Sequence, residues 1–335
     1  MNALDPNKLK VVKEVGRPGV LLAVAQQPAS SRLFFGASDF KVHDFDVMAE
    51  KPEPVEYAGH ESYVTGVVLA GKYMISGGYD GRLIWWDTET KQQVRSILAH
   101  SRWIRDLAAT PNGKHVVSVA DDMVCRIWDV ASGKLVRDLL GHDSRTPNHF
   151  PSMLYACAIS PDGRYIATGD RVGKNIVWDL ANGRRLATLE TPIMYTWDPK
   201  ARIHSIGGVR SLAFSSDSSL LAVGGMGQVG NIDHLGGLAR VEVFNWQKAE
   251  RTHEFAGDEY NGLVERLAFA PKDQWLLAAG GDNAGFIKFF DLSASKLIKQ
   301  DKAPMHVHDF VLNENGGTIY AAGHGKAVVW SLDAA

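Results

Sequence analysis

An all-β fold is predicted by three observations on this chain of 335 residues. An aromatic residue followed by an acid, an amide or a serine ends a strand-like run seven times: Phe45-Asp46, Trp86-Asp87, Trp128-Asp129, Trp178-Asp179, Phe244-Asn245, Phe290-Asp291 and Trp330-Ser331. Most consecutive aromatics of this set are roughly 40 to 46 residues apart, a period typical of four-stranded blades. Pro, Gly, Asn and Asp recur between the runs as hairpin turns. The sequence therefore predicts a seven-bladed β-propeller of four-stranded antiparallel blades.

Turn chemistry divides each repeat into four short strands. The first two strands are joined by segments such as Ser160-Pro161-Asp162-Gly163, in which Pro presets one φ angle and Asp or Gly tolerates the left-handed region. The third strand carries the repeated aromatic. The fourth follows a further turn, such as Ala131-Ser132-Gly133-Lys134.

The two ends of the chain predict how the ring closes. Residues 7–16 have the pattern of a fourth strand but follow no third strand, whereas the last repeat stops soon after Trp330-Ser331-Leu332 and lacks a fourth strand. We therefore expect the N-terminal strand to join the last blade, so that residues 7–332 form a single propeller domain. Closure of this kind removes the open sheet edges that promote aggregation.

Composition narrows the class of protein. The chain has 45% hydrophobic residues and 33 glycines, which fits a packed β protein, and its net charge of -2 gives no sign of nucleic-acid binding. Cys125 and Cys157 lie in different repeats without metal-type spacing, so neither a disulfide nor a zinc site is expected. The N-terminus lacks the apolar core of a signal peptide, and no apolar run could span a bilayer. We expect a cytoplasmic, monomeric propeller, although a longer parent polypeptide remains open.

Two repeats carry a more specific pattern. The second contains Gly59-His60, Ser76, Asp80 and Trp86, and the third contains His100, Ser118, Asp122 and Trp128. By these residues and the repeat period, the chain resembles the WD-repeat β-propeller family over residues 7–332. The resemblance implies that each set of His, Ser, Asp and Trp forms a hydrogen-bonded line across its blade. The fourth repeat has His142, Thr168 and Trp178 but carries Asp170 two residues early, which leaves that line undecided.

Three long insertions interrupt the repeats, at 142–155, 190–208 and 225–240. Alternate connections of an antiparallel meander fall at the same end, so the insertions are expected on one face. They contain Met153, Tyr155, Tyr195, Trp197 and His234 among other aromatic, apolar and histidine side chains. Such residues are enriched in recognition surfaces. Alternatively, they pack inward as a satellite core beneath the loops, and the sequence leaves both possibilities open.

A second candidate surface is the rim of the central channel on that face. In the family, the start of each first strand often contacts partners. Alignment of the repeats places these residues there: Tyr63, Thr65, Trp103, Arg105, Met153, Tyr155, Arg210, Glu265, His306 and His308. Arg105 and Arg210 are candidates for bidentate binding of a carboxylate or an acidic peptide. The same residues could instead satisfy one another and water.

A search for catalytic and cofactor-binding motifs provides little support for either function. Gly225-Met226-Gly227-Gln228-Val229-Gly230 matches the GxGxxG string of dinucleotide sites, but a loop and a strand follow it instead of the required helix. Five possible metal ligands map to the insertions, namely His142, His149, His204, Asp233 and His234. Because no pair has the spacing of a known metal motif, we expect neither a metal nor a cofactor. Nucleophile elbows, P-loops and kinase signatures are absent from the sequence.

These observations favour a non-catalytic scaffold that binds a protein or peptide through the loop-rich face, without nucleic acid or membrane partners. The alternatives are a small-ligand or enzymatic site in the central channel, and a sensory or structural module of a larger polypeptide. A deep pocket with convergent carboxylates or histidines would favour the first alternative.

Overall fold

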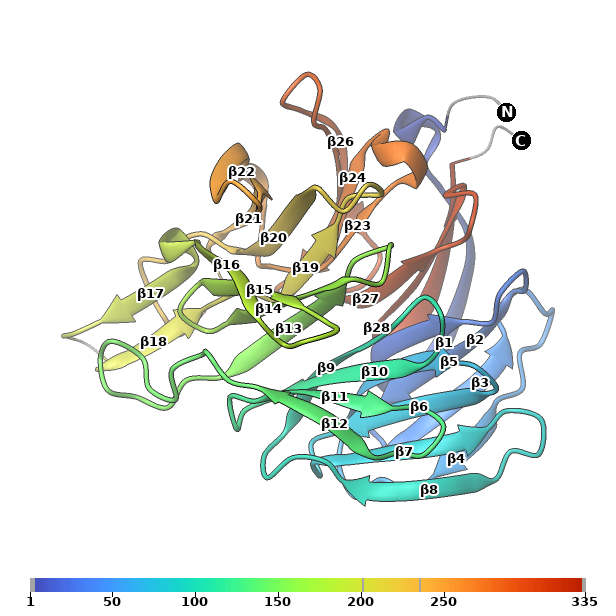
Figure 1. Ribbon diagram of the computed structural model, residues 1–335. Coiled ribbons are helices and arrows are strands. Elements are labelled where there is room, and N and C mark those ends of the chain that lie inside the picture. Colours follow the sequence, from blue (N-terminus) through green and yellow to red (C-terminus); the bar gives the residue numbers. More distant parts are fainter. Residues whose placement is uncertain (1–3, 201, 235, 333–335) are drawn as a thin grey trace.

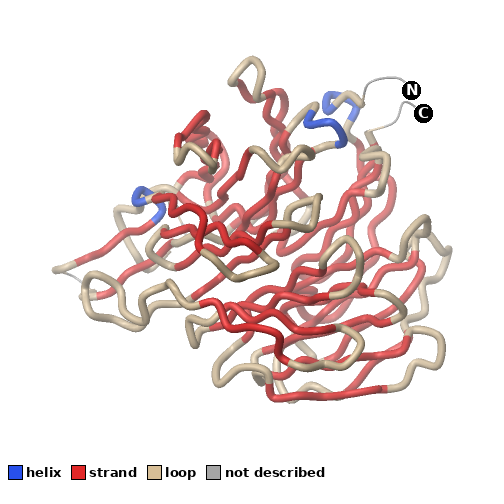
Figure 2. The backbone as a smooth tube through the Cα atoms, in the orientation of Figure 1, coloured by secondary structure: helices blue, strands red, loops and turns tan. Residues whose placement is uncertain are grey.

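The computed structural model of the protein describes residues 4–200, 202–234 and 236–332. Nearly all of its regular structure is β-strand (Figure 2). Within these ranges the helical segments are three short 3-10 turns: η1 (Pro6–Lys8), η2 (Pro192–Met194) and η3 (Pro271–Asp273). None of the helices in the described part of the chain is long and apolar enough to cross a membrane.

The strands form successive antiparallel sheets (Figure 1). The largest joins both ends of the chain in the order β27 (Val307–Leu312), β28 (Thr318–Ser331), β1 (Lys10–Gln26), β2 (Arg32–Ala37), β3 (Lys41–Asp46) and β4 (Val55–Ala58). The next sheet along the chain contains β5 (Val64–Ala70), β6 (Tyr73–Gly78), β7 (Arg82–Asp87) and β8 (Gln93–Leu98). It is followed by a sheet of β9 (Ile104–Ala109), β10 (His115–Ala120), β11 (Cys125–Asp129) and β12 (Leu135–Leu139).

The second half of the chain continues this arrangement. One sheet contains β13 (Leu154–Ile159), β14 (Tyr165–Asp170), β15 (Lys174–Asp179) and β16 (Arg185–Glu190). A two-stranded ribbon of β17 (Tyr195–Asp198) and β18 (His204–Gly207) follows it. Next comes a sheet of β19 (Ser211–Phe214), β20 (Leu220–Met226), β21 (Leu238–Asn245) and β22 (Glu250–Asn261). The last four-stranded sheet contains β23 (Leu263–Phe269), β24 (Leu276–Gly281), β25 (Gly285–Asp291) and β26 (Lys296–Ala303).

The prediction of seven four-stranded blades is wrong. The chain is an all-β propeller with six blades when each sheet of four or more strands in the described ranges is counted as one. Five of these sheets have four strands, and the remaining one has six. The first and last repeats were expected to form separate blades but share the six-stranded sheet. The physical reason is that β1 and β28 are continuous strands of 17 and 14 residues, each of which pairs with two neighbours.

The N-terminal strand pairs with the last strand of the chain. Lys10 lies opposite Ser331, and the antiparallel register continues to Gly16 opposite Lys326. The remainder of β1 pairs with β2, from Leu21 opposite Ala37 to Gln26 opposite Leu33. Figure 1 shows the two ends of the colour scale side by side at this junction. One strand therefore joins the beginning of the repeat array to its end.

The hydrophobic core lies between neighbouring sheets. In β7, four consecutive residues from Leu83 to Trp86 are buried, because each sheet is covered on both faces. Trp85 packs in a cluster with Leu107 of the next sheet, and its indole Nε1 donates a hydrogen bond to the carbonyl of Val130 at 3.0 Å. Apolar contact and a buried indole bond thus hold these two sheets together.

A line of hydrogen bonds crosses the sheet β5–β8. His60 Nδ1 lies 2.8 Å from Asp80 Oδ2, and its Nε2 lies 2.8 Å from Ser76 Oγ. Ser76 Oγ also accepts a hydrogen bond from Trp86 Nε1 at 2.9 Å. The buried imidazole and indole therefore each have a polar partner, as burial requires.

The sheet β9–β12 has the same line. His100 lies 3.0 Å from an oxygen of Asp122 and 2.7 Å from Ser118 Oγ, which accepts from Trp128 Nε1 at 2.9 Å. Arg126 adds an ion pair to Asp122 at 2.9 Å. Although burial alone would raise it, the hydrogen bonds from His100 and Arg126 hold the pKa of Asp122 well below its ordinary value.

A third line occurs where the sequence left the matter undecided. His142 lies 2.7 Å from Asp170 and 2.8 Å from Thr168 Oγ1, and Trp178 Nε1 donates to the same hydroxyl at 2.9 Å. Asp170 stands at the end of β14 instead of in the following turn, where Val172 lies. Its carboxylate nevertheless reaches the imidazole, and both side chains are almost fully buried.

Candidate functional site

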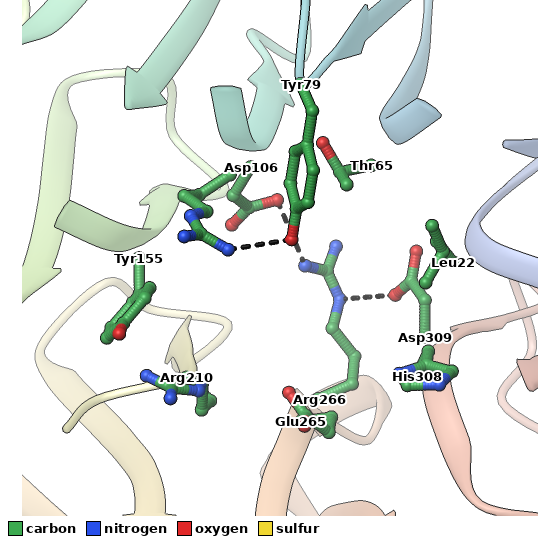
Figure 3. A pocket seen from close by; sticks show the side chains of 11 residues that line it. Leu22, Thr65, Tyr79, Asp106, Tyr155, Arg210, Glu265, Arg266, His308 and Asp309 are labelled. Carbon is green, nitrogen blue, oxygen red and sulfur yellow. Dashed lines mark hydrogen bonds and ion pairs between the residues drawn. The ribbon is translucent and has the colours of Figure 1, made fainter. Parts of the chain in front are cut away.

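A cavity of about 300 Å³ lies where the first strands of the repeats converge (Figure 3). These inner strands contact one another in turn around the molecule, in the order β1, β5, β9, β13, β19, β23 and β27 and back to β1. The lining side chains are Leu22, Thr65, Tyr79, Arg105, Asp106, Tyr155, Arg210, Glu265, Arg266, His308 and Asp309. Most of them are polar or charged, so the channel has a hydrophilic wall.

A recurring backbone irregularity aims side chains into this cavity. In six of the inner strands the pairing register skips one residue. The skipped residues are Leu22, Thr65, Arg105, Tyr155, Glu265 and His308. A bulge of this kind leaves one residue unpaired and redirects its side chain. All six line the cavity, and five of them were placed on the channel rim from the sequence, Leu22 being the exception.

An ion-pair network crosses the cavity. Arg266 Nε lies 3.0 Å from Asp309 Oδ1, and Arg266 Nη1 lies 3.7 Å from Asp106 Oδ1. Asp309 also accepts the backbone N–H of Val24 at 2.8 Å, and Asp106 accepts that of Cys157 at 3.0 Å. The network therefore ties five inner strands together. The sequence did not single out Asp106, Arg266 or Asp309, because each is adjacent to a bulge residue and nothing in the repeat pattern marks it.

Burial sets the protonation of these acids. It raises the pKa of Asp106 to about 6, although Arg266 opposes the shift, and it also raises the pKa of Asp309. The nearby Asp309 carboxylate raises the pKa of Arg266. Since both carboxylates bind a guanidinium and a backbone N–H, their geometry is that of structural ion pairs.

Four aromatic rings form a continuous row beside the cavity, which we call the aromatic ladder: Phe40, Tyr63, Tyr79 and Trp103. Consecutive ring centres are 5.8, 5.7 and 4.5 Å apart, and the last pair is stacked with only 6° between the ring planes. Phe40, Tyr63 and Trp103 remain 41%, 44% and 48% exposed. The sequence predicted Tyr63 and Trp103 as rim residues but missed Phe40 and Tyr79, which lie in turns.

The two predicted arginines have different surroundings. Arg105 donates through Nε and Nη2 to Asp121, at 2.8 and 2.7 Å, and through Nη1 to the hydroxyl of Tyr79 at 2.7 Å. Its donors are thus committed within the chain. Arg210 lies 3.6 Å above the centre of the Tyr155 ring, and its buried Nη1 has no hydrogen-bond partner. Arg210 is therefore the arginine that retains capacity for an added acceptor.

The inserted segments contact one another. Tyr195 donates its hydroxyl proton to Asn148 at 2.7 Å, which links the first two insertions, and the Trp197 ring lies 5.2 Å from that of Phe150. The backbone N–H of Val229 donates to Thr196 Oγ1 at 3.1 Å, joining the second insertion to the third. Tyr195, Trp197 and Phe150 are half-buried as a result.

The other predicted residues of the insertions lie as follows. The Met153 sulfur accepts the hydroxyl of Tyr155 at 2.9 Å and lies 3.7 Å from Nη2 of Arg105. Met153 and Tyr155 thus belong to the channel wall beside Arg105. His234 is exposed, next to an Asp233 that forms an ion pair with Arg202.

Three histidines gather at one side of the cavity. His306 directly precedes β27 and His308 lies in it, as the rim alignment placed them, and His324 comes from the facing part of β28. Burial lowers the pKa of His308 to about 4. Although burial alone would raise it, His306 and Arg210 hold the pKa of the adjacent Glu265 below its ordinary value.

Comparison with known proteins agrees with this geometry. A family model described as WD domain, G-beta repeat matches residues 53–87, 91–129, 133–179 and 199–229. The first three matches each include one complete set of His, Ser or Thr, Asp and Trp.

Similar proteins are named nuclear distribution proteins. One from Arthroderma otae, called PAC1, is 29% identical over 202 residues, which cover 52% of this chain and 40% of the relative. Another from Uncinocarpus reesii, called PAC1-2, is 30% identical over 175 residues, covering 48% of this chain and 37% of the relative. The matched part spans about two fifths of the length of these relatives. From its repeats, its hydrogen-bonded lines and these matches, the chain belongs to the WD-repeat family.

Proposed function

We propose that this protein is a non-catalytic scaffold that binds a segment of another protein at the mouth of its central channel. The observation that carries the proposal is the aromatic ladder, which presents Phe40, Tyr63 and Trp103 to solvent in one continuous row. Exposed Trp and Tyr in a fixed geometry are the side chains most enriched in binding hot spots.

The ladder is held rigid from below. Asp121 fixes the guanidinium of Arg105, Arg105 fixes the hydroxyl of Tyr79, and the Tyr79 ring supports the Trp103 ring face to face. A partner that binds Trp103 therefore does not have to order it, which reduces the entropic cost of association.

Next to the ladder, the channel offers a site for one acidic group. Arg210 has an unpartnered buried Nη1 above the Tyr155 ring. A carboxylate from a bound segment would complete its hydrogen bonds, and a charge-assisted bond of this kind is stronger than a neutral one. The proposed partner segment thus combines apolar or aromatic side chains with an acidic residue.

The inserted loops extend this surface in the proposal. Met153 and Tyr155 border Arg105 and Arg210, whereas Tyr195, Trp197 and His234 lie on the insertions farther along the chain. Because Tyr195 and Trp197 are half-buried by contacts among the insertions, we assign them mainly a shaping role. WD repeats commonly bind proteins, which supports this partner class over nucleic acid or membrane. A monomeric, cytoplasmic protein remains part of the proposal.

The experiment compares two variants as baits. The wild-type protein and the Tyr63→Ala/Trp103→Ala double variant are immobilised, and the proteins retained from an extract of the source organism are quantified by mass spectrometry. The proteins retained by the wild type should fall at least about tenfold on the double variant, since hot-spot truncations cost roughly 2 kcal/mol or more each.

A matched control removes exposed apolar area elsewhere. Leu98 and Leu140 are 69% and 71% exposed and lie outside the ladder, so Leu98→Ala/Leu140→Ala should keep all retained proteins. Melting curves establish that both double variants are folded. If the retained proteins survive the loss of Tyr63 and Trp103 but not the loss of the two leucines, the proposed surface is wrong.

A further inference from the structure

The three histidines at the channel mouth are close enough to share one ion. Each of His306, His308 and His324 offers a ring nitrogen, and these three nitrogens lie within 4.8 Å of one another. The ring centres are 4.5 to 5.2 Å apart. Within the described ranges, no other group of three or more His, Cys, Asp or Glu side chains meets this condition.

The backbone fixes this arrangement. His306 precedes β27 directly and His308 is its second residue, and the backbone N–H of His324 donates to the carbonyl of His306 at 3.2 Å. The third histidine is thus placed opposite the first by strand pairing. The cluster does not depend on a mobile loop, which favours a preformed site.

Two of the imidazoles have buried nitrogens that make no hydrogen bond. His306 Nε2 and His308 Nε2 are both enclosed and make no hydrogen bond, and the His306 residue is 93% buried. A buried polar atom without a partner costs free energy, so native structures rarely keep one without a reason. Two such atoms side by side indicate that something can bind between them.

The other nitrogen of His306 is already committed. Its Nδ1 lies 2.7 Å from the carbonyl oxygen of Asp282. Because a carbonyl can only accept, Nδ1 carries a proton, and Nε2 is the nitrogen that offers a lone pair to an ion when the ring is neutral. A histidine that donates one N–H to a backbone carbonyl and turns its other nitrogen inward has the arrangement found in metal-ligating histidines.

A carboxylate stands beside the cluster. Glu265 Oε1 lies 3.7 Å from His306 Nε2, which is too long for a hydrogen bond but places a negative charge next to the three imidazoles. Three imidazoles and one nearby carboxylate are a donor set that suits zinc and the ions that resemble it.

We infer that His306, His308 and His324 bind one divalent transition-metal ion of the zinc class, with Glu265 supplying compensating charge. The expectation from sequence that the protein holds no metal considered the histidines of the insertions and looked for short motif spacings. The present cluster joins two neighbouring residues to a third on the next strand, a pattern that such motifs do not describe.

The site must contract slightly to hold the ion. At a metal–nitrogen distance of about 2.0 to 2.1 Å, ligands of a tetrahedral ion are roughly 3.4 Å apart, whereas the present limit is 4.8 Å. His324 is exposed and has solvent on one side, so its ring can turn toward the two buried histidines. The cavity next to His308 leaves room for a water molecule or a partner's carboxylate as the fourth ligand.

The test is a metal titration of the whole chain, produced without a histidine tag and stripped with a chelator. Isothermal titration with zinc chloride should give one ion per chain, and cobalt(II) should give the visible absorption of a tetrahedral complex. His308→Ala and His324→Ala should each weaken zinc binding by at least about 10- to 100-fold, the range found when even a supporting residue of a metal site is lost.

The matched control is His149→Ala/His234→Ala, which removes two exposed histidines of the insertions and should leave the titration unchanged. His324 is itself exposed, so its replacement should leave the fold intact, as circular dichroism can establish. Absence of stoichiometric zinc binding by the wild type would overturn the inference, as would binding that survives both cluster variants. Neither result bears on the aromatic ladder, because the bait experiment uses different residues.

Discussion

The side chain of Arg266 in β23 is bonded to that of Asp309 in β27, with its Nε 3.0 Å from Asp309 Oδ1, and this ion pair joins two different sheets inside the channel. Arg266→Met would leave Asp309 and Asp106 without their shared cation. We expect the free energy of unfolding to fall by roughly 3 kcal/mol, because unpaired buried charge is costly. Urea unfolding measures the loss.

Arg202→Met is the control for this prediction. Arg202 pairs with Asp233 on the surface, where both side chains are well exposed. Exposed pairs contribute about 0 to 1 kcal/mol, so the stability of this variant should be close to that of the wild type. Equal losses in the two variants would contradict the structural role of the channel network.

The pH dependence of stability should reveal the titration of the Asp106 carboxyl group. Burial raises its pKa to about 6, whereas an unfolded Asp titrates near about 3.9. The folded state therefore keeps a proton that the unfolded state loses, and the contribution of Asp106 to stability is present below about pH 4 and is lost as the pH rises through about 6. Asp106→Asn cannot ionise, so its stability relative to the wild type should increase from about pH 4 to about pH 7.

The contribution of Asp122 to stability should change with pH in the opposite direction. Its pKa is held well below the ordinary value by His100 and Arg126 in spite of burial. The stability that it contributes is present above about pH 4 and is lost as the pH falls further. The stability of Asp122→Asn relative to the wild type should therefore be lowest near neutral pH and recover in acid. Urea unfolding of both variants and the wild type at a series of pH values measures these stability differences. If the two differences change with pH in the same direction, these assignments are wrong.

Replacement of Trp103 and replacement of Arg105 should have different effects on the stability of the protein. Trp103→Ala removes an exposed ring and should cost less than about 1 kcal/mol of stability. Arg105→Ala leaves Asp121 without its bidentate partner in a poorly solvated place and should cost roughly 3 kcal/mol. Thermal melting of the two variants checks this difference, and similar melting temperatures would mean that Arg105 is not a support of the ladder.

Replacement of Thr168 tests whether the third hydrogen-bonded line contributes as much to stability as the other two. Thr168→Val keeps the shape of the side chain but leaves His142 Nε2 and Trp178 Nε1 without a partner. We expect a loss of about 1 to 3 kcal/mol, similar to that of Ser76→Ala in the sheet β5–β8. A neutral Thr168→Val beside a costly Ser76→Ala would show that the line through Asp170 contributes little.

Deletion of residues 1–16 tests the junction between β1 and β28. The pairing from Lys10 opposite Ser331 to Gly16 opposite Lys326 would be lost, which exposes one edge of β28. We expect a lower melting temperature and concentration-dependent aggregation, since open edges invite pairing between molecules. Light scattering during a melt detects both, and a truncated protein with unchanged melting would contradict the prediction.

The sequence predicted the all-β propeller because Trp-Asp ends and turn residues recur with the chain's own period. It overestimated the number of sheets, since a repeat count cannot tell that β1 and β28 each continue from one set of pairings into the next. It placed the N-terminal strand beside the last one because residues 7–16 have the pattern of a fourth strand without a third, whereas the last repeat lacks a fourth strand.

At the site, alignment of the repeats found most bulge residues but not their neighbours. Asp106, Arg266 and Asp309 each follow a bulge residue, and only the three-dimensional convergence of the strands brings them into one network. Phe40 and Tyr79 lie in turns that look unremarkable in sequence. The line through Asp170 was left undecided because a fixed spacing rule ignores that a carboxylate can reach the same imidazole from the strand end.

The pairing of β1 with β28 also determines when folding of the chain can be completed during synthesis. Glu14 and Lys326, which form an ion pair across it, are 312 positions apart in the sequence. During synthesis the first strand therefore emerges from the ribosome long before its partner exists, and it must wait while every intervening sheet is made. Contacts of such long sequence separation form late and slowly. Until then residues 10–16 of the nascent chain lack their partner strand, so the yield in the cell should depend on chaperones that shield this segment.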